Sequence, residues 1–96
     1  MIVKKHRAPG GRLVLAVCDD DILAKRFSEG ELQLDLSSNF YDGAKMTEEE
    51  TEKLFRSASI INFVGKKAVR LGLKSKLISE SRIITISGIP HAQAAF

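Results

Sequence analysis

Cys18 and the three aspartates that follow it are the densest group of potentially reactive side chains in this sequence. Cys18 ends the apolar run that begins at Leu13, and Asp19, Asp20 and Asp21 come directly after it. A thiol between a buried strand and the start of a helix can be stabilised as a nucleophilic thiolate by the helix dipole. The aspartates oppose this role, because their negative charge raises the pKa of the thiol. We therefore interpret Cys18 as a buried, unreactive side chain.

The aspartates offer oxygen ligands of the kind that bind Mg²⁺ in phosphoryl-transfer sites. Helix capping explains the aspartates without a metal. A carboxylate before a helix accepts hydrogen bonds from backbone N–H groups and is stabilised by the positive end of the helix dipole. The candidates for softer, zinc-type ligands are Cys18, His6 and His91, and no two of them have the spacing of a zinc motif. We predict no metal site and no cofactor.

A second group of candidates is basic. Asn62, Lys66 and Arg70 are spaced by four residues, and Lys67 and Lys74 by seven. One helix would bring these side chains together opposite its apolar side, as a basic helix face. Such a face can neutralise nucleic-acid phosphates without reading the base sequence. The alternative is an ordinary solvated helix surface.

His91 follows Gly88-Ile89-Pro90 at the end of the last predicted strand, where a rigid backbone would project it toward an RNA or a reacting group. The alternative is a hydrogen-bonded histidine on a tail that packs against the sheet. We group His91 with the basic helix face as a candidate nucleic-acid contact.

The net charge of +3 conceals a division along the chain. Residues 1–18 carry a charge of +4 with no acidic side chain, residues 19–58 carry −6, and residues 59–96 carry +5. If the two basic ends meet in space, they form a surface that attracts phosphates. Internal pairing of the opposite charges is the alternative.

Turn residues and alternation define the elements of the first half of the chain. Residues 2–7 and 12–18 flank an Ala-Pro-Gly-Gly turn and predict an N-terminal β-hairpin, with the second strand buried on both faces and the first at a sheet edge. A short helix is expected over residues 22–27, ended by Gly30. Alternation over residues 31–36 then predicts a strand whose core-facing side chains are Leu32, Leu34 and Leu36.

The second half contains a capping box, in which Thr47 precedes Glu50 by three residues and predicts a helix start at about residue 48. Apolar residues at helical spacing extend this helix to about Leu73, as one bent helix or as two. Gly65 would lie inside it, where a glycine permits close approach of another backbone or a ligand. Residues 82–87 predict a β-branched strand, which a short tail follows.

The 96 residues, 44% hydrophobic and 28% charged, are typical of one soluble domain spanning residues 1–96. We predict an α+β fold: an N-terminal β-hairpin and a mixed sheet of about four strands, with two to three helices packed on it. A single cysteine indicates a reducing, cytoplasmic setting. The apolar runs are too short for a signal peptide or a membrane span, so we expect no membrane partner.

Five segments in fixed order resemble a known family: VLAVCDD at residues 14–20, FSEGEL at 27–32, Phe40-Tyr41, NFVGKKAV at 62–69 and GIPHAQ at 88–93. They are similar, over nearly the whole chain, to the small archaeal proteins grouped as domain of unknown function 424. That family has no assigned activity, so the resemblance transfers no catalytic residue. It implies a cytosolic archaeal protein in a group with suspected links to translation.

Our leading hypothesis is a non-enzymatic RNA- or ribosome-associated binding protein, with ribosomal RNA or the ribosome as its partner. An alternative is a small cytosolic enzyme whose site joins Cys18, the Asp19–Asp21 cluster and His91, which requires these groups to lie within hydrogen-bonding reach. A further alternative is a module that binds another protein through the acidic segment 48–52. The nucleic-acid contacts of the leading hypothesis are Lys66, Lys67, Arg70, Lys74, Asn62 and His91, together with the basic terminal segments.

Overall fold

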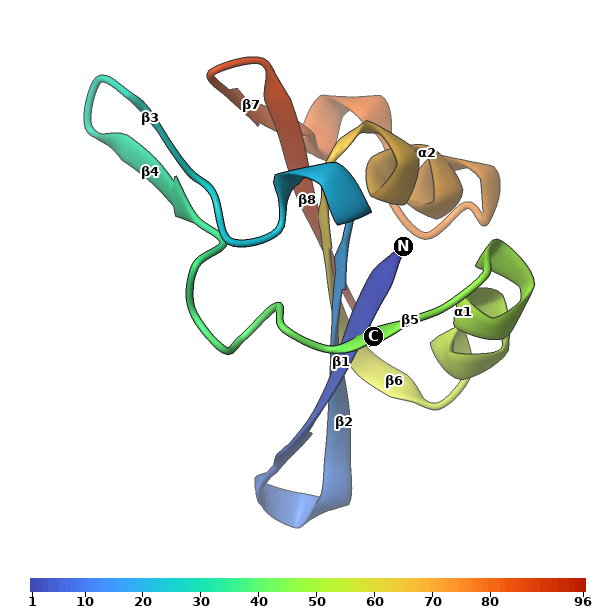
Figure 1. Ribbon diagram of the computed structural model, residues 1–96. Coiled ribbons are helices and arrows are strands. Elements are labelled where there is room, and N and C mark those ends of the chain that lie inside the picture. Colours follow the sequence, from blue (N-terminus) through green and yellow to red (C-terminus); the bar gives the residue numbers. More distant parts are fainter.

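A six-stranded mixed sheet forms the centre of the computed structural model, which describes residues 1–96 (Figure 1). Its strand order is β5-β1-β2-β6-β8-β7, and only β2 and β6 are parallel. These strands are β1 (Ile2–Ala8), β2 (Arg12–Cys18), β5 (Ala44–Lys45), β6 (Ala58–Val64), β7 (Ile84–Ile86) and β8 (Ile89–Ala95). The helices α1 (Glu48–Phe55) and α2 (Lys66–Lys74) cover one face, while β3 (Arg26–Glu29) and β4 (Leu32–Asp35) form a separate hairpin. The α+β class is confirmed, with six strands in the main sheet in place of about four.

The N-terminal hairpin is confirmed. β1 and β2 pair antiparallel from Ile2 opposite Cys18 to Ala8 opposite Arg12, and a 3-10 turn over Pro9–Gly11 joins them. Gly10 has a φ of 84°, a left-handed conformation that glycine adopts without steric penalty. β1 lies near the sheet edge as predicted, because only the two-residue β5 pairs with its outer side.

The helix predicted over residues 22–27 is wrong. The chain makes one 3-10 turn, Asp20–Ile22, and then enters β3, so Gly30 turns a hairpin instead of ending a helix. A helix there would lose the pairing of β3 with β4, which packs Phe27 against the cluster that contains Ile22 and Leu34, so tertiary packing overrides the local signal. Leu34 and Leu36 face the core as expected, whereas Leu32 is 48% exposed.

The capping box at Thr47 is confirmed, but the long helix after it is wrong. Thr47 Oγ1 accepts a hydrogen bond from the backbone N–H of Glu50 at 3.1 Å, and Glu50 Oε1 accepts one from the N–H of Thr47 at 3.0 Å. The helix ends at Phe55, and residues 58–64 form β6 in the middle of the sheet. Apolar side chains occur on both faces of β6 and give no clear alternation, so its sequence is compatible with either a strand or a buried helix.

The tail expected after the last strand is also wrong, because residues 89–95 form β8. This strand pairs antiparallel with β6 from Ala95 opposite Ile60 to His91 opposite Val64. Ala92 and Ala94 are buried on the side of the helices, where their small side chains let α2 pack against the strand. The alanines give little strand propensity, so the sheet context determines this element.

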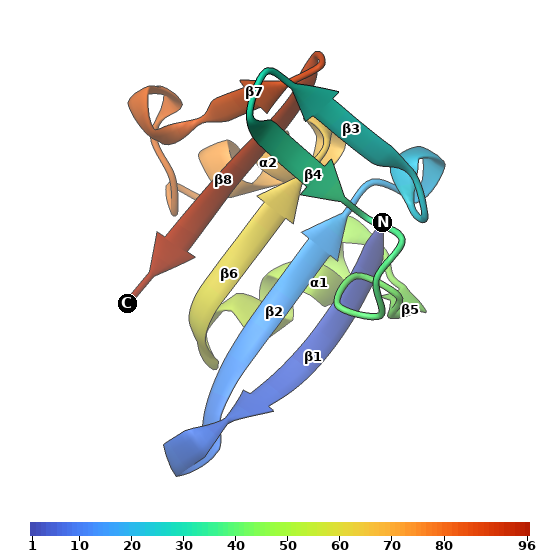
Figure 2. The same ribbon diagram turned by 90° about the vertical axis from the view of Figure 1, so that its left-hand side faces the viewer.

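Two apolar clusters hold the sheet between its layers. On the helix side, side chains such as Leu15, Phe63 and Leu71 form the larger cluster. On the other side, Leu34 and Leu36 pack with residues from the ends of β2 and β6. Figure 2 shows the β3–β4 hairpin crossing only the upper part of this second face. None of the helices is long and apolar enough to cross a membrane.

Candidate nucleic-acid interface

The sheet separates the six predicted contact residues into two groups. Lys66, Lys67, Arg70 and Lys74 are all exposed on α2, as the helical spacing predicts. Asn62 lies on β6, so the prediction that it shares a helix with the lysines is wrong. Its neighbour Phe63 points into the helix-side core, and strand alternation therefore places Asn62 on the opposite face. His91 pairs with Val64 and shares that opposite face.

The start of α2 is held by Asp19, which lies 48 residues earlier in the chain. One carboxylate oxygen of Asp19 accepts the N–H of Lys67 at 2.9 Å, and the other accepts that of Ala68 at 2.7 Å. Gly65 precedes the helix with a φ of 105°, and a Cβ there would lie 2.4 Å from Asp19 Cγ. Gly65 therefore permits a close approach, as predicted. It lies at the start of α2, however, and not inside a helix, and the group that approaches it is the carboxylate of Asp19. Asp19 caps this distant helix instead of a local one.

The three aspartates do not converge on a common site. Asp20 forms ion pairs with the N-terminal ammonium group and with Lys45 Nζ at 3.2 Å, and these hydrogen-bonded partners lower the pKa of its carboxyl group. Asp21 is exposed, and Asp19 is occupied with α2. No three His, Cys, Asp or Glu side chains are grouped as a metal ion would require. The cluster is therefore structural.

Cys18 and His91 lie on the same sheet face but are not neighbours. Val64 pairs with both of them, so two strand spacings of about 4.8 Å each separate their backbones, and the thiol donates a hydrogen bond to the carbonyl of Asp19. Burial raises the pKa of Cys18 to about 12, with a further contribution from Asp19. Burial also lowers the pKa of His91. Within one chain, the pair required by the enzyme alternative is not within hydrogen-bonding reach.

Acidic side chains of α1 border the basic helix face of Lys66, Lys67, Arg70 and Lys74. Lys74 Nζ lies 3.9 Å from Glu52 Oε1. Lys67 and Arg70 share a hollow of about 350 Å³ with Glu48. These carboxylates weaken the positive potential along α2, because opposite charges within a Debye length of about 8–10 Å partly cancel. Lys66 forms no ion pair.

On the opposite side of the sheet, the strands carry no acidic side chain in the part that the β3–β4 hairpin leaves uncovered (Figure 2), and the loop that bears Phe40 borders this part with the exposed Asp42. The register aligns four strands there in two rows, one through Lys4 and Asn62 and one through His6 and Ile60. We call this surface the open sheet face. Its side chains are Lys4, His6, Arg12, Val14, Ile60, Asn62, Gln93 and Ala95. Ala16, between Lys4 and Asn62, is buried in the second apolar cluster and is not part of this face.

Polar and aromatic groups are arranged in pairs on the open sheet face. The Nε2 of Gln93 donates to Asn62 Oδ1 at 3.1 Å, which leaves amide donors and an acceptor of the pair for a ligand. The ring of His6 stacks on Phe40 with centroids 4.4 Å apart and planes 12° from parallel. Phe40 is 37% exposed, so this pair is accessible from solvent. Lys4 and Arg12 have no carboxylate partner.

The charge division along the chain explains why this surface lacks carboxylates. The basic first segment forms β1 and β2, and the basic last segment forms nearly all of β6 and the whole of β7 and β8. The acidic middle forms the β3–β4 hairpin, the connecting loop and α1 at the periphery. The two basic ends therefore meet in one sheet. Arg12 and His6 lie in the basic first segment, which the sequence predicts as a phosphate contact, whereas Gln93 is not among the predicted contacts because only the register brings it beside Asn62.

Comparisons with known proteins agree with this fold. The family described as "Protein of unknown function (DUF424)" matches residues 6–95. A crystal structure of an uncharacterized conserved protein from Methanopyrus kandleri is similar, with a TM-score of 0.79 and 29% sequence identity. The similarity covers 96% of this chain and 87% of that one. No curated protein matches the sequence. The match across nearly the whole length shows that the chain belongs to the DUF424 family.

Proposed function

We propose that this chain is a non-enzymatic RNA- or ribosome-associated binding protein that holds RNA phosphates on its open sheet face. The observation that supports this most strongly is a surface built from four strands that bears cationic, amide and aromatic side chains and no carboxylate. Each phosphate that a lysine or arginine neutralises releases counterions, so the binding free energy comes mainly from these charges. The family's suspected link to translation favours RNA as the nucleic acid.

The open sheet face is favoured over α2 as the main contact surface. Lys4 and Arg12 have no carboxylate partner, whereas Lys74 pairs with Glu52 and Glu48 borders Arg70. A phosphate approaching α2 would meet repulsion from α1 as well as attraction from the lysines. Lys66 and Lys67, exposed at the start of α2, are assigned a secondary contact on the other side of the molecule.

The composition of the open sheet face suits contact with the RNA backbone more than base readout. A single accessible aromatic pair, His6 with Phe40, offers stacking for one base. The Asn62–Gln93 amides can bond a phosphate, a 2′-hydroxyl or a base edge. Because phosphate contacts carry no sequence information, we expect binding that varies little among RNA sequences.

Paired charge reversals would test this assignment. A fluorescently labelled single-stranded RNA of mixed sequence is titrated with the wild type and with Lys4→Glu/Arg12→Glu at several salt concentrations. Loss of two phosphate contacts should reduce the slope of log K against log salt by about 1.4, since each contact on a single strand contributes about 0.7. Lys25→Glu/Lys53→Glu changes the net charge equally at exposed positions elsewhere and should leave the slope nearly unchanged.

Two results would contradict the proposal in different ways. A wild type that shows no salt-dependent RNA binding would refute the function. The variant Lys66→Glu/Lys67→Glu is measured in the same way. If it alone lowers the RNA affinity, the contact lies on α2 and the assignment to the open sheet face is wrong.

Ribosome association would be tested by sedimentation of the protein from its native source with ribosomal particles through sucrose gradients, at low and high salt. We expect movement with a ribosomal subunit that nuclease or high salt abolishes. Protein that stays at the top of every gradient would contradict a stable complex with the ribosome.

A further inference from the structure

The second half of β8 has a partner strand on one side only. β7 pairs with β8 from Ile89 to His91, whereas β6 pairs with it as far as Ala95. From Gln93 onward, the side of β8 that faces away from β6 is therefore a free sheet edge. A free edge presents unpaired backbone N–H and C=O groups to any strand that can approach it.

Hydrogen bonds at both ends of β8 show which residues present these groups. The carbonyl of Pro90 accepts the N–H of Gly65 at 2.9 Å, and the N–H of Phe96 donates to the carbonyl of Ser59 at 2.9 Å. Even-numbered residues of β8 therefore direct their backbone groups toward β6. Because the backbone groups of successive strand residues point to opposite sides of the strand, the N–H and C=O groups of Gln93 and Ala95 point toward the free edge.

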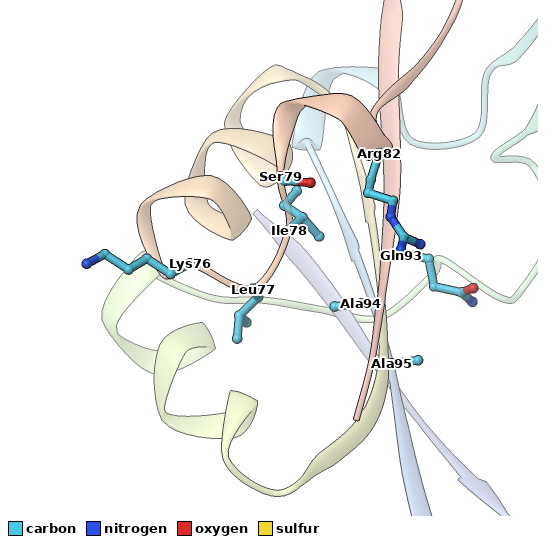
Figure 3. Close-up of a pocket in the computed structure, with 8 residues that line it drawn as sticks. All are labelled: Lys76, Leu77, Ile78, Ser79, Arg82, Gln93, Ala94 and Ala95. Carbon is cyan, nitrogen blue, oxygen red and sulfur yellow. The ribbon is translucent and has the colours of Figure 1, made fainter.

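The free edge forms one side of a groove of about 370 Å³ (Figure 3). The segment after α2 forms the other side, and two backbone hydrogen bonds fix it to the helix end: Lys76 N–H to Leu73 O and Leu77 N–H to Gly72 O, both 3.0 Å. This pattern is a Schellman motif. Ile78 also packs closely on Gly72, where a Cβ would lie 2.8 Å from Ile78 Cδ1. The groove is therefore preformed, which reduces the entropy cost of binding.

The two walls of the groove differ in chemistry. Leu77 and Ile78 provide an apolar wall on the helix side. On the other side Arg82 lies beside Gln93, and its guanidinium group forms no ion pair (Figure 3). An added strand directs alternate side chains to these two walls. The best occupant therefore alternates apolar with acidic residues.

The outer edge of β1 is unlike the free edge of β8. β1 carries Lys5 and Arg7 beyond its short pairing with β5, and charged side chains of this kind discourage strand addition. The β8 edge has Gln93 and Ala95, which are uncharged and leave the backbone accessible. A second copy of the chain is a poor occupant, because β8 contains no carboxylate that could pair with Arg82.

We propose that the free edge of β8 binds an extended segment of a partner protein by β-strand addition, with an acidic side chain of that segment paired to Arg82. This site borders the RNA surface, because the side chains of Gln93 and Ala95 belong to the open sheet face, but its backbone contacts at the free edge do not depend on the proposed function. The backbone groups of Gln93 and Ala95 supply affinity, and the unlike walls of the groove supply specificity.

The test uses a fluorescein-labelled peptide of about seven residues that alternates glutamate and valine, long enough to span the free edge. Fluorescence anisotropy measures its affinity, and ¹⁵N-edited NMR follows the backbone amides. We expect saturable binding with amide shifts concentrated at Gln93 and Ala95. A lysine–valine peptide should bind at least about tenfold more weakly, because it places a like charge beside Arg82.

Two protein variants separate the backbone contribution from the charge contribution. Ala95→Pro removes an outward N–H that forms no bond in the free protein and should weaken binding about fivefold. Arg82→Glu should weaken it five- to tenfold, whereas Lys53→Glu, the same charge change on α1, should have little effect. Circular dichroism confirms that each variant is folded.

Three results would overturn the proposal. The first is absence of peptide binding with the wild type. The second is equal binding of a peptide N-methylated at alternate residues, since charge alone would then explain the affinity. The third is a dimer in analytical ultracentrifugation that Ala95→Pro dissociates, which would show that a second copy occupies the edge.

Discussion

Replacement of Asp19 by alanine should destabilise the protein far more than replacement of either neighbouring aspartate. Asp19 is buried, and its two carboxylate oxygens accept the backbone N–H groups of Lys67 and Ala68. The alanine variant leaves both donors without a partner, and the buried N–H of Ala68 has no access to water in compensation. The helix also loses a negative charge at its positive end.

The magnitude follows from these two bonds. A hydrogen bond to a charged group contributes about 1.5–3 kcal/mol, and loss of an N-cap costs about 0.5–2 kcal/mol. Water can replace the carboxylate at the half-buried N–H of Lys67, so we expect a total loss of about 3 kcal/mol. For a domain of this size that corresponds to a fall in Tm of roughly 12–24 °C.

Urea unfolding at pH 7, followed by far-UV circular dichroism, measures the loss. Asp21→Ala is the matched control, because Asp21 is exposed and should change the free energy of unfolding by less than about 0.5 kcal/mol. Asp19→Asn keeps an acceptor oxygen and should lie between the two. If Asp19→Ala and Asp21→Ala proved equally stable, the inference that Asp19 caps α2 would be wrong.

A double-mutant cycle with Gly65 strengthens this test. Gly65→Ala is destabilising alone, because its Cβ would lie 2.4 Å from Asp19 Cγ and its φ of 105° is unfavourable for alanine. In the Asp19→Ala background the clash disappears and only the backbone strain remains. The double variant should therefore lose less stability than the two single variants added together. Strict additivity would contradict the contact.

Three further outcomes are expected. Lys76→Gly should stabilise the protein by about 0.5–1 kcal/mol in urea unfolding, because Lys76 has a φ of 60° at the end of α2; a loss of stability would contradict this. Cys18, whose pKa burial raises to about 12, should resist a disulfide reagent such as DTNB at pH 8 until urea unfolds the chain; rapid native reaction would show an accessible thiol. Burial lowers the pKa of His91 below 6.5, so the unfolded chain takes up the proton first and stability falls as the pH drops below about 6.5. His91→Gln should flatten this decline in urea unfolding between pH 7.5 and 5, and an unchanged slope would assign it to other groups.

Local signals predicted the elements whose determinants lie within a few residues of one another. The Pro9 to Gly11 turn and the Thr47 capping box depend on backbone conformation and short-range bonds, so the sequence was sufficient for the first hairpin and the start of α1. β6 could not be distinguished from a helix, because Ile60 and Val64 are apolar on the same face as Asn62, and the strand therefore lacks a clear alternation of polar and apolar residues. The aspartates predicted a helix over residues 22–27 for a related reason. A capping residue indicates that a helix start is near, but Asp19 caps α2, which lies far away in the sequence.

The candidate site was predictable only in part. Helical spacing was sufficient to place Lys66 and Arg70 on an exposed helix surface, since both belong to α2. The open sheet face required the register of four strands from opposite ends of the chain, which the sequence does not contain in any local pattern. The spacing of Asn62 from Lys66 predicts a shared helix, whereas the structure places Asn62 on a strand beside Gln93.

Ultraviolet crosslinking would show directly whether RNA contacts the open sheet face of the protein. The protein is crosslinked to the RNA bound to it in its native source, and mass spectrometry identifies the peptides that carry a nucleotide. If the open sheet face binds RNA, the crosslinks will lie on β1 and on the loop that bears Phe40, where the His6–Phe40 pair is accessible. Crosslinks confined to α2, or none above the level of a protein that does not bind RNA, would contradict RNA binding by this face.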